Sequence, residues 1–406
     1  MPENPTFILG GYQTDFARNW LREEIGLANA MTEVVEGVLD ATGVAPEEIG
    51  SGHVGNFAAE LYASQGQLGA FLLEAHPALR GLPTGRHEAA CASGSIAILA
   101  ASAEIAAGRY DVSLVVGVEQ MKTVDPQQGG DFLGTAGWYE REAKGVPFPF
   151  PSLFGRLGDA YAERYGLDDA HLTRISEINR ENARRNPLAQ TRSWPNNPEK
   201  EAQPLVGRIR IGDASQITDG AVGVVLASQG YAERWAAARG ISLDDVPRIE
   251  GWGHRTAPML FDEKLLESKD REYVLPHTRQ AITDAFARAG VADVWELDAI
   301  ETHDCFTTSE YMAIDHFGIT APGESWKAIE DGTIAFGGRL PVNPSGGLIG
   351  VGHPVGATGI RQLLDAYRQV SGTAGDYQVE GAHRVATLNL GGSGTTSASF
   401  IVARGE

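Results

Sequence analysis

The chain has 406 residues, of which 42% are hydrophobic and 21% charged, and a net charge of −20 at neutral pH. This length allows two domains of ordinary size with buried cores. The acidic balance, without any run rich in lysine or arginine, argues against nucleic acid and anionic membrane surfaces as partners. No apolar run reaches the roughly 18 to 20 residues needed to span a bilayer.

Taken in chain order, apolar runs rich in β-branched residues predict buried strands, and segments with helical periodicity lie between them. The strands are expected at 6–11, 111–120, 221–228, 384–392 and 397–404, and the helices at 27–43, 94–108, 153–166, 171–186, 278–290 and 356–370. Strands that alternate with helices indicate an α/β protein with layered sheets.

The middle of the chain has a different composition. Residues 120–210 mix aromatic, proline and charged residues and show helical stretches but no strand pattern. We interpret 120–210 as a lid or loop insertion in an N-terminal half made of 1–119 and 211–245, followed by a C-terminal half, 246–406. The same order of helix, strand and strand occurs in both halves, which suggests an internal duplication.

Only two cysteines are present, too few for a disulfide framework. The N-terminus lacks a positively charged segment ahead of an apolar core, so no signal peptide is expected. The C-terminal VARGE is not a peroxisomal address. We therefore expect a cytoplasmic protein.

The first cysteine, Cys91, lies in HEAACASGSIAILAASAEI, just where a helical pattern begins. Free cysteines are most often small core residues. A thiolate at this place would instead be stabilised by the unpaired N–H groups and the positive dipole end of the helix. The residues alone leave the core cysteine and the nucleophile equally open.

The second cysteine, Cys305, follows His303 and Asp304 directly after the strand-like run LDAI. Three reactive side chains at a strand terminus indicate a functional site better than packing. A metal site would need about four ligands, usually with CxxC or HxxxH spacing, and neither spacing occurs. No metal is therefore expected.

The third element is NPSGGLIGVGHPVGATGIRQ, in which glycines flank His353. The glycine spacing does not fit a dinucleotide-binding loop, and neither a P-loop nor a nucleophile elbow is present. A histidine in such a glycine-rich turn is expected to face a cavity. Two thiols and two imidazoles suit a thiolate that attacks a thioester, with the second thiol exchanging a proton with a carbon acid.

These motifs together resemble the thiolase family over nearly the whole chain, most specifically NPSGG…GHP.GATG. His303-Asp304-Cys305-Phe306 stands where most thiolases have Asn-Glu-Ala-Phe. Asn389-Leu390-Gly391 stands where most have a Cys-x-Gly motif with the second catalytic cysteine. Both departures are similar to the sterol-carrier-protein type of thiolase, in which this cysteine has moved to the His-Asp-Cys-Phe loop.

The resemblance implies a role for each residue. Cys91 would be the acylated nucleophile, His353 its base and Cys305 the acid/base at the carbon. His303 would help bind the enolate oxygen, and the backbone N–H groups of Cys91 and Gly391 would form an oxyanion hole. Ser215 in DASQITDGAVGVVL would contact the pantetheine of coenzyme A.

The resemblance also implies a duplicated, five-layered α-β-α-β-α fold with a lid, and a homodimer or homotetramer. Acyl-CoA and coenzyme A would be substrates, with no permanently bound cofactor. The reaction would be the cleavage of a 3-ketoacyl-CoA by CoA, or the reverse condensation.

Two alternatives stay open at this point. One is a thiolase-fold acyltransferase or retro-aldolase without CoA-dependent cleavage. The other is a non-catalytic CoA-ester binder partnered with a small OB-fold protein. The lid aromatics Phe148, Phe150 and Phe154 are interpreted as packing or as part of an acyl pocket, and Arg184 and Arg185 are candidates for contacts with the CoA phosphates.

Overall fold

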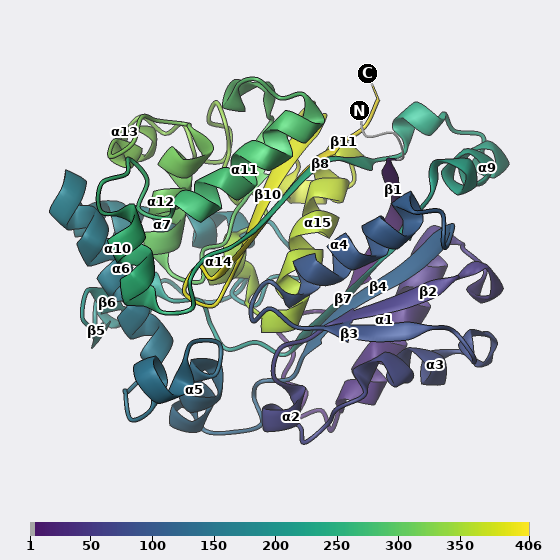
Figure 1. Cartoon of the computed structure of the whole chain (residues 1–406), viewed down its shortest axis with the longest axis horizontal. Coiled ribbons are helices and arrows are strands. Elements are labelled where there is room, and N and C mark those ends of the chain that lie inside the picture. The colour runs from purple at the N-terminus through teal and green to yellow at the C-terminus, as the bar shows by residue number, and fades with distance from the viewer. Residues whose placement is uncertain (1–4, 406) are drawn as a thin grey trace.

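The computed structural model describes residues 5–405 (Figure 1). Its strands are β1 (Thr6–Gln13), β2 (Ser51–Gly55), β3 (Thr84–His87), β4 (Val112–Glu119), β5 (Pro204–Val206), β6 (Ile209–Arg210), β7 (Gly220–Ala227), β8 (Arg248–Thr256), β9 (Ala299–Glu301), β10 (Arg384–Gly391) and β11 (Thr396–Ala403). Its α-helices are α1 (Leu27–Thr42), α2 (Ala59–Tyr62), α3 (Phe71–Ala75), α4 (Ser93–Ala106), α5 (Pro126–Gly134), α6 (Pro149–Tyr165), α7 (Asp169–Ala183), α8 (Pro198–Glu201), α9 (Gln229–Arg239), α10 (Phe261–Ser268), α11 (Pro276–Ala289), α12 (Thr307–Phe317), α13 (Ser325–Glu330), α14 (Gly347–Val351) and α15 (Thr358–Val370). None of the helices within 5–405 is both long and apolar enough to cross a bilayer.

Nine strands are hydrogen-bonded in the order β3-β2-β4-β7-β1-β8-β11-β10-β9, and the two ends of this order repeat one topology. In the first half β2 and β4 are parallel, while β7 runs antiparallel to both β4 and β1. In the second half β9 and β10 are parallel, while β11 runs antiparallel to both β10 and β8. The predicted duplicated α/β fold is therefore confirmed.

Helices α4 and α15 lie between the two half-sheets and form the middle of five layers (Figure 1). Side chains alternate along a strand, so Val224 of β7 faces this middle layer while Val225 faces α1 on the outside. The middle cluster joins Ile98 of α4, Ile360 of α15 and Phe400 of β11. Helices α11 and α12 pack on the outer side of the second half, which completes the α-β-α-β-α arrangement.

Helices α4 and α15 of the middle layer approach each other most closely near their first turns. A Cβ atom on Gly94 would lie 2.9 Å from the carbonyl oxygen of Gly356, and one on Gly117 would lie 2.6 Å from Cα of Ala357. Only glycine permits such close backbone approach. The turn before α4 carries Cys91 and the segment before α15 carries His353, so this packing brings two candidate residues together.

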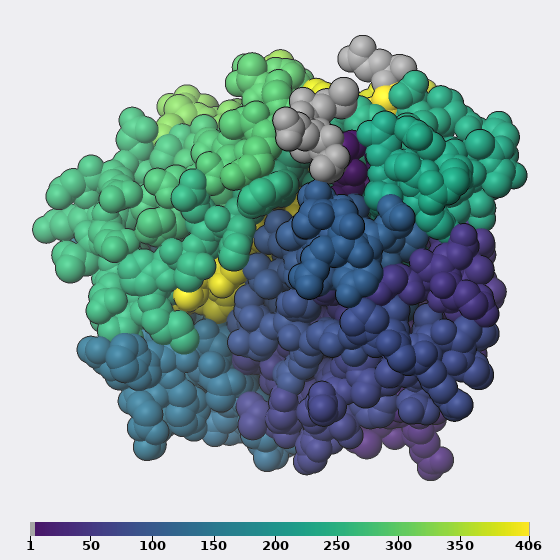
Figure 2. Space-filling model, turned by 45° about the vertical axis from the view of Figure 1, so that its right-hand side comes forward, coloured from purple at the N-terminus to yellow at the C-terminus, as the bar shows by residue number. Residues whose placement is uncertain are grey.

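The segment 120–210 contains the two expected helices, α6 and α7, and two short strands that the sequence did not predict. Strands β5 and β6 pair as a hairpin, and runs of two or three residues are too short to show a periodicity. Phe154 of α6 packs on Phe306, with ring centroids 4.8 Å apart. Figure 2 shows this segment, in blue, beside the purple first half and below the green second half.

Candidate active site

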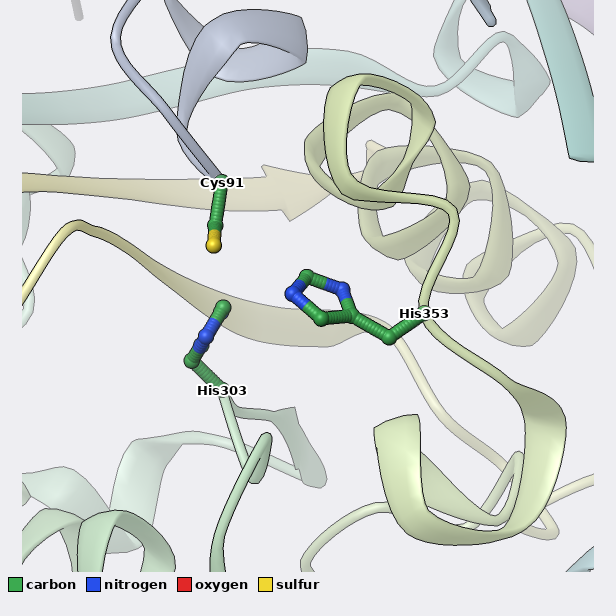
Figure 3. Close-up of side chains that lie close together, drawn as sticks. All are labelled: Cys91, His303 and His353. Atoms are coloured by element: carbon green, nitrogen blue, oxygen red, sulfur yellow. The ribbon is translucent and has the colours of Figure 1, made fainter. Parts of the chain in front are cut away.

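Three loops far apart in the sequence meet at one place. Sγ of Cys91 and one ring nitrogen from each of His303 and His353 lie within 4.8 Å of one another (Figure 3). A cavity of about 200 Å³ is lined by Cys91, Cys305 and His353, together with Ser215. The structure thus brings Cys91, His303, Cys305 and His353 close together, and their chemical roles stay predictions.

The turn between β3 and α4 presents the thiol of Cys91. Ala90 has φ of +52°, a backbone conformation that side-chain-bearing residues rarely adopt. Ser93 stabilises the turn, because its hydroxyl accepts the Ala89 N–H at 2.9 Å and donates to the Ala90 carbonyl at 2.6 Å. Cys91 is 9% exposed and borders the cavity, so it is not sealed in the core.

Burial determines the charge states of the first thiol and its neighbouring histidine. Burial raises the pKa of Cys91 to about 12, even though the N–H groups of Gly392 and Cys91 favour the thiolate. The backbone donors at the helix N-terminus, one of the two possibilities left open by the sequence, therefore do not lower this pKa, because loss of water outweighs them. Burial, with a smaller effect of Arg361, lowers the pKa of His353 to about 3. Both groups are neutral at pH 7.

His353 is held so that one ring nitrogen is free to act as a base. Its backbone N–H donates to Oγ1 of Thr218 at 2.9 Å, and its Nδ1 lies 2.7 Å from Oγ1 of Thr358. The Thr358 hydroxyl donates to the Pro354 carbonyl at 3.2 Å and so accepts a hydrogen bond from the N–H at Nδ1. The lone pair then lies on Nε2, which is buried and has no hydrogen-bond partner within the described chain.

The loop after β9 brings two more reactive groups to the site. Nδ1 of His303 lies 3.1 Å from Nδ2 of Asn389. Burial, and then the neighbouring His353, lower the pKa of His303 well below its usual value, so this ring is neutral too. Burial, followed by the nearby Cys91 and Asp304, raises the pKa of Cys305, which leaves a protonated thiol in the cavity.

Asp304 has a structural task in the same loop. Its carboxylate accepts the N–H of Ile349 at 3.1 Å and the amide of Asn179 at 2.8 Å, and it also accepts the N–H of Leu348. A Cβ atom on Gly347 would lie 2.3 Å from this carboxylate, so glycine is needed there. Asp304 thus fixes the start of α14 to the loop that carries His303 and Cys305.

The sulfur and two imidazoles that converge are also groups that bind zinc. A metal would need a lone pair from each ring, whereas the amide nitrogen of Asn389 faces Nδ1 of His303 and leaves the ring proton on Nε2. This arrangement therefore suits an oxygen atom of a substrate better than a metal ion.

The other two predicted residues also lie at the site. Ser215 lines the cavity, and its backbone N–H donates to the carbonyl of Cys305 at 2.9 Å. Gly391 ends β10 so close to the nucleophile turn that a Cβ atom would lie 2.1 Å from the Ala89 carbonyl oxygen. The N–H that interacts with the Cys91 sulfur belongs to the next residue, Gly392.

The sequence did not single out Glu119, which connects the segment after β2 to the segment before α15. This buried carboxylate accepts the N–H groups of Phe57 at 2.9 Å, Ala58 at 3.1 Å and Gly356 at 3.0 Å. An acidic residue at the end of the apolar run LVVGVE was the available signal, because a buried charge needs several donors.

The wall of the cavity is mainly apolar. The aromatic residues Phe148, Phe150 and Phe154 contribute to it, as do Phe57 and other apolar side chains. These three lid aromatics therefore line the pocket, and Phe154 also packs in the core. Arg185, in contrast, stacks on Phe336, with its guanidinium 4.4 Å from the ring centroid.

Comparisons with known proteins agree with this geometry. Residues 6–191 match the thiolase N-terminal domain, and residues 263–404 match the thiolase C-terminal domain-like family. The chain belongs to the thiolase family. It is thus an enzyme, an acyltransferase of the thiolase type.

The full-length relatives include the acetyl-CoA acetyltransferase of Methanothermobacter thermautotrophicus, which is 34% identical over 98% of this chain and 99% of its own length. Human sterol carrier protein 2 is 28% identical over 77% of this thiolase and 57% of its own length, in line with the resemblance to that type. Among solved structures, the Ltp2-ChsH2(DUF35) aldolase superposes with a TM-score of 0.78 at 21% identity, covering 98% of both chains. That last likeness concerns the fold.

Proposed function

We propose that this thiolase cleaves 3-ketoacyl-CoA with coenzyme A, and condenses acyl-CoA with acetyl-CoA in reverse, through an acyl group on Cys91. The observation that carries the proposal is one cavity lined by both thiols and by His353, with a ring nitrogen of His303 within 4.8 Å of the Cys91 sulfur. The similarity to an acetyl-CoA acetyltransferase supports acetyl-CoA as one substrate. Coenzyme A enters as a substrate, and no permanently bound cofactor is involved.

The first step is the formation of the acyl-enzyme. Cys91 Sγ attacks the 3-keto carbon while Nε2 of His353 takes the thiol proton, since both groups start neutral. The N–H groups of Cys91 and of the Gly391–Gly392 segment stabilise the alkoxide. The Cα–Cβ bond then breaks, and its electron pair forms the enolate of acetyl-CoA.

The remaining steps use the second thiol. Cys305 gives its proton to the enolate carbon, which releases acetyl-CoA, while His303 contacts the enolate oxygen. Cys305, now a thiolate, takes the thiol proton of an incoming CoA, and the CoA thiolate attacks the acyl carbonyl on Cys91. Cys91 then leaves as the thiolate and takes back the proton held on Nε2 of His353. Ser215 contacts the pantetheine arm. In the synthetic direction Cys305 removes the proton from acetyl-CoA.

The substrate class follows from the cavity wall. Its phenylalanines and other apolar side chains, in about 200 Å³, suit a hydrocarbon acyl group larger than acetyl. We propose a homodimer or homotetramer in the cytoplasm, with 120–210 acting as the lid on the two halves 1–119 with 211–245 and 246–406. We also propose a small OB-fold partner protein, since one fold neighbour, the Ltp2-ChsH2(DUF35) aldolase, has a second component.

The test is intact-mass analysis after incubation with acetyl-CoA. An acetyl adduct is expected on the wild type and on Cys305→Ser, and none on Cys91→Ser. The same samples are then assayed for acetyl-CoA formation from acetoacetyl-CoA and CoA. An adduct without this cleavage would favour an acyltransferase or retro-aldolase, and ligand binding without any adduct would favour the non-catalytic CoA-ester binder.

A further inference from the structure

Asn389 occupies the place where most thiolases have their second catalytic cysteine, and its amide connects two parts of the site. The side chain is 1% exposed. Its Oδ1 accepts the hydroxyl proton of Ser95, on the first turn of α4, at 2.8 Å. Its Nδ2 lies 3.1 Å from Nδ1 of His303. A row of side chains thus runs from the helix of the nucleophile, through Asn389, to His303.

The surroundings of the Asn389 amide show which of its two atoms is the oxygen and which is the nitrogen. The carbonyl oxygen faces the contact of α4 with α15, where a Cβ atom on Gly359 would lie 2.7 Å from it and 2.3 Å from Oγ of Ser95. The amide nitrogen, which only donates, faces the imidazole. Nδ1 of His303 therefore accepts a hydrogen bond and carries no proton.

The neutral ring of His303 must then carry its single proton on Nε2. This nitrogen is buried and has no hydrogen-bond partner among residues 5–405, and the ring to which it belongs brings one nitrogen within 4.8 Å of the Cys91 sulfur and of a His353 nitrogen. His353 has the opposite arrangement, with its proton on Nδ1 and its lone pair on Nε2. The two rings, whose centroids are 5.2 Å apart, thus present one donor and one acceptor to the same space.

We infer that Asn389 is a positioning residue, which holds His303 in the tautomer whose Nε2–H donates to the enolate oxygen of the substrate. The inference rests on the proposed thiolase function. In the opposite tautomer a lone pair of Nε2 would face the developing negative charge. Most thiolases have a catalytic cysteine at the position of Asn389, whereas this chain has its second cysteine in the loop of His303. The two differences then depend on each other, because the residue at position 389 orients His303.

The decisive variant is Asn389→Asp, which keeps the size of the side chain but removes its donor. A carboxylate accepts only, so it draws the His303 proton to Nδ1, and Nε2 is a donor only while the ring is protonated. The groups that face His303 are His353, Cys91 and Arg361, of which only Arg361 is charged at pH 7. Condensation by this variant is expected to fall roughly tenfold per pH unit above the new His303 pKa. The wild-type enzyme is expected to show no such fall in condensation rate with rising pH.

A partial reaction separates positioning from general damage. Exchange of labelled CoA into acetyl-CoA needs acylation of Cys91 but forms no enolate. At pH 8, Asn389→Asp is expected to lower condensation about 100-fold, the usual effect of losing one oxyanion donor, and to lower exchange less than threefold. Equal loss of both reactions would overturn the inference.

The coupling to His303 is tested with a double-mutant cycle. Asn389→Leu is expected to lower condensation at least about tenfold in the wild type, but to have no further effect in His303→Asn, where no tautomer exists. Additive losses would overturn the inference. The ¹⁵N shifts of His303, assigned by comparison with His303→Asn, report the protonated nitrogen directly. They decide the tautomer even if the wild type forms no carbon–carbon bond, an outcome that would refute the proposed function instead.

Discussion

The turn that carries Cys91 and the turn that carries His353 occupy matching places in the two halves, and they solve different problems. Each lies just before the helix of the middle layer, α4 or α15, and each uses positive φ, at Ala90 in the first and at Gly352 in the second. The first turn exposes a thiol to the cavity, whereas the second holds an imidazole through Thr218 and Thr358. The duplicated fold brings the starts of α4 and α15 together. The two halves then differ in sequence, so that the first presents the thiol of Cys91 and the second presents the imidazole of His353.

The comparison also shows what a helix N-terminus does not do by itself. Both groups lie at such a terminus, yet burial raises the pKa of Cys91 and lowers that of His353, so that neither is charged. At Cys91 desolvation outweighs the helix dipole, whereas at His353 both effects disfavour the charged imidazolium. Proton transfer must therefore accompany the attack on the substrate.

The largest expected effect comes from removing the base. His353→Ala is expected to lower the rate of Cys91 acylation about 10²- to 10⁴-fold, because the other neutral imidazole near the thiol, His303, accepts from Asn389 at Nδ1 and carries its proton on Nε2. Rapid-quench mass analysis of the acetyl adduct measures this rate. Thr358→Val is the matched control, which keeps the imidazole but loses its partner and should cost about tenfold. If His353→Ala were acylated at a rate close to that of the wild type, His353 would not be the base that deprotonates Cys91.

The second prediction tests the charge of the nucleophile. With a pKa of about 12, above the usual value for a thiol, Cys91 is protonated through pH 9. Its thiolate fraction rises about tenfold per pH unit, so alkylation by iodoacetamide should rise about 100-fold from pH 7 to pH 9. Mass spectrometry of Cys305→Ser isolates this one thiol. A constant rate over that range would show a preformed thiolate.

The sequence predicted some strands and missed others, and the reason is physical. Continuous apolar runs located β1, β4, β7, β10 and β11. Strand β8, RIEGWGHRT, was missed because it is rich in glycine and polar residues, and the structure explains the glycines. Cβ atoms on Gly251 and Gly253 would lie 2.1 and 1.8 Å from the carbonyl oxygens of Ala285 and Ala281 of α11. A helix packed directly on a strand leaves no side-chain pattern to detect.

The sequence also predicted only some of the residues of the site. Reactive residue types made Cys91, His303, Cys305 and His353 candidates, and the resemblance of their motifs to the thiolase family implied their roles. The residues that orient them were not found. Asn389, Glu119 and Thr358 are ordinary polar residues in sequence, and their tasks appear only through contacts with residues distant along the chain.

The third prediction concerns the apolar side of the cavity. Gly130 of α5 lines the cavity, and a Cβ atom there would lie 3.6 Å from the Phe148 ring, an ordinary contact. Gly130→Leu should fill the space for a long acyl chain and lower kcat/KM for long-chain relative to acetyl substrates about 10- to 100-fold. Gln127→Leu, on the exposed side of the same helix, is the control. An unchanged ratio would place the acyl chain elsewhere.

The smallest expected effect concerns the carboxylate that joins the two turns. Glu119, at the end of β4 in the first half, accepts the N–H of Gly356, which precedes α15 in the second, along with the Phe57 and Ala58 N–H groups. Glutamine has one accepting oxygen, and its NH₂ group would face these donors. Glu119→Gln should therefore lower the free energy of unfolding by about 1 to 3 kcal/mol, measured by urea denaturation.

Glu104→Gln provides the matched control for this change. Glu104 lies on α4 and reaches the ring of His53 at 3.1 Å, but it is partly exposed and accepts no backbone N–H from the second half. Its loss should change stability by less than about 0.5 kcal/mol. Because Glu119 fixes the segment before α15 to the end of β4, its loss should also slow acylation, whereas Glu104→Gln should leave that rate unchanged. If both variants behaved alike, the two turns would be held together by helix packing alone, and the carboxylate would contribute nothing to their alignment.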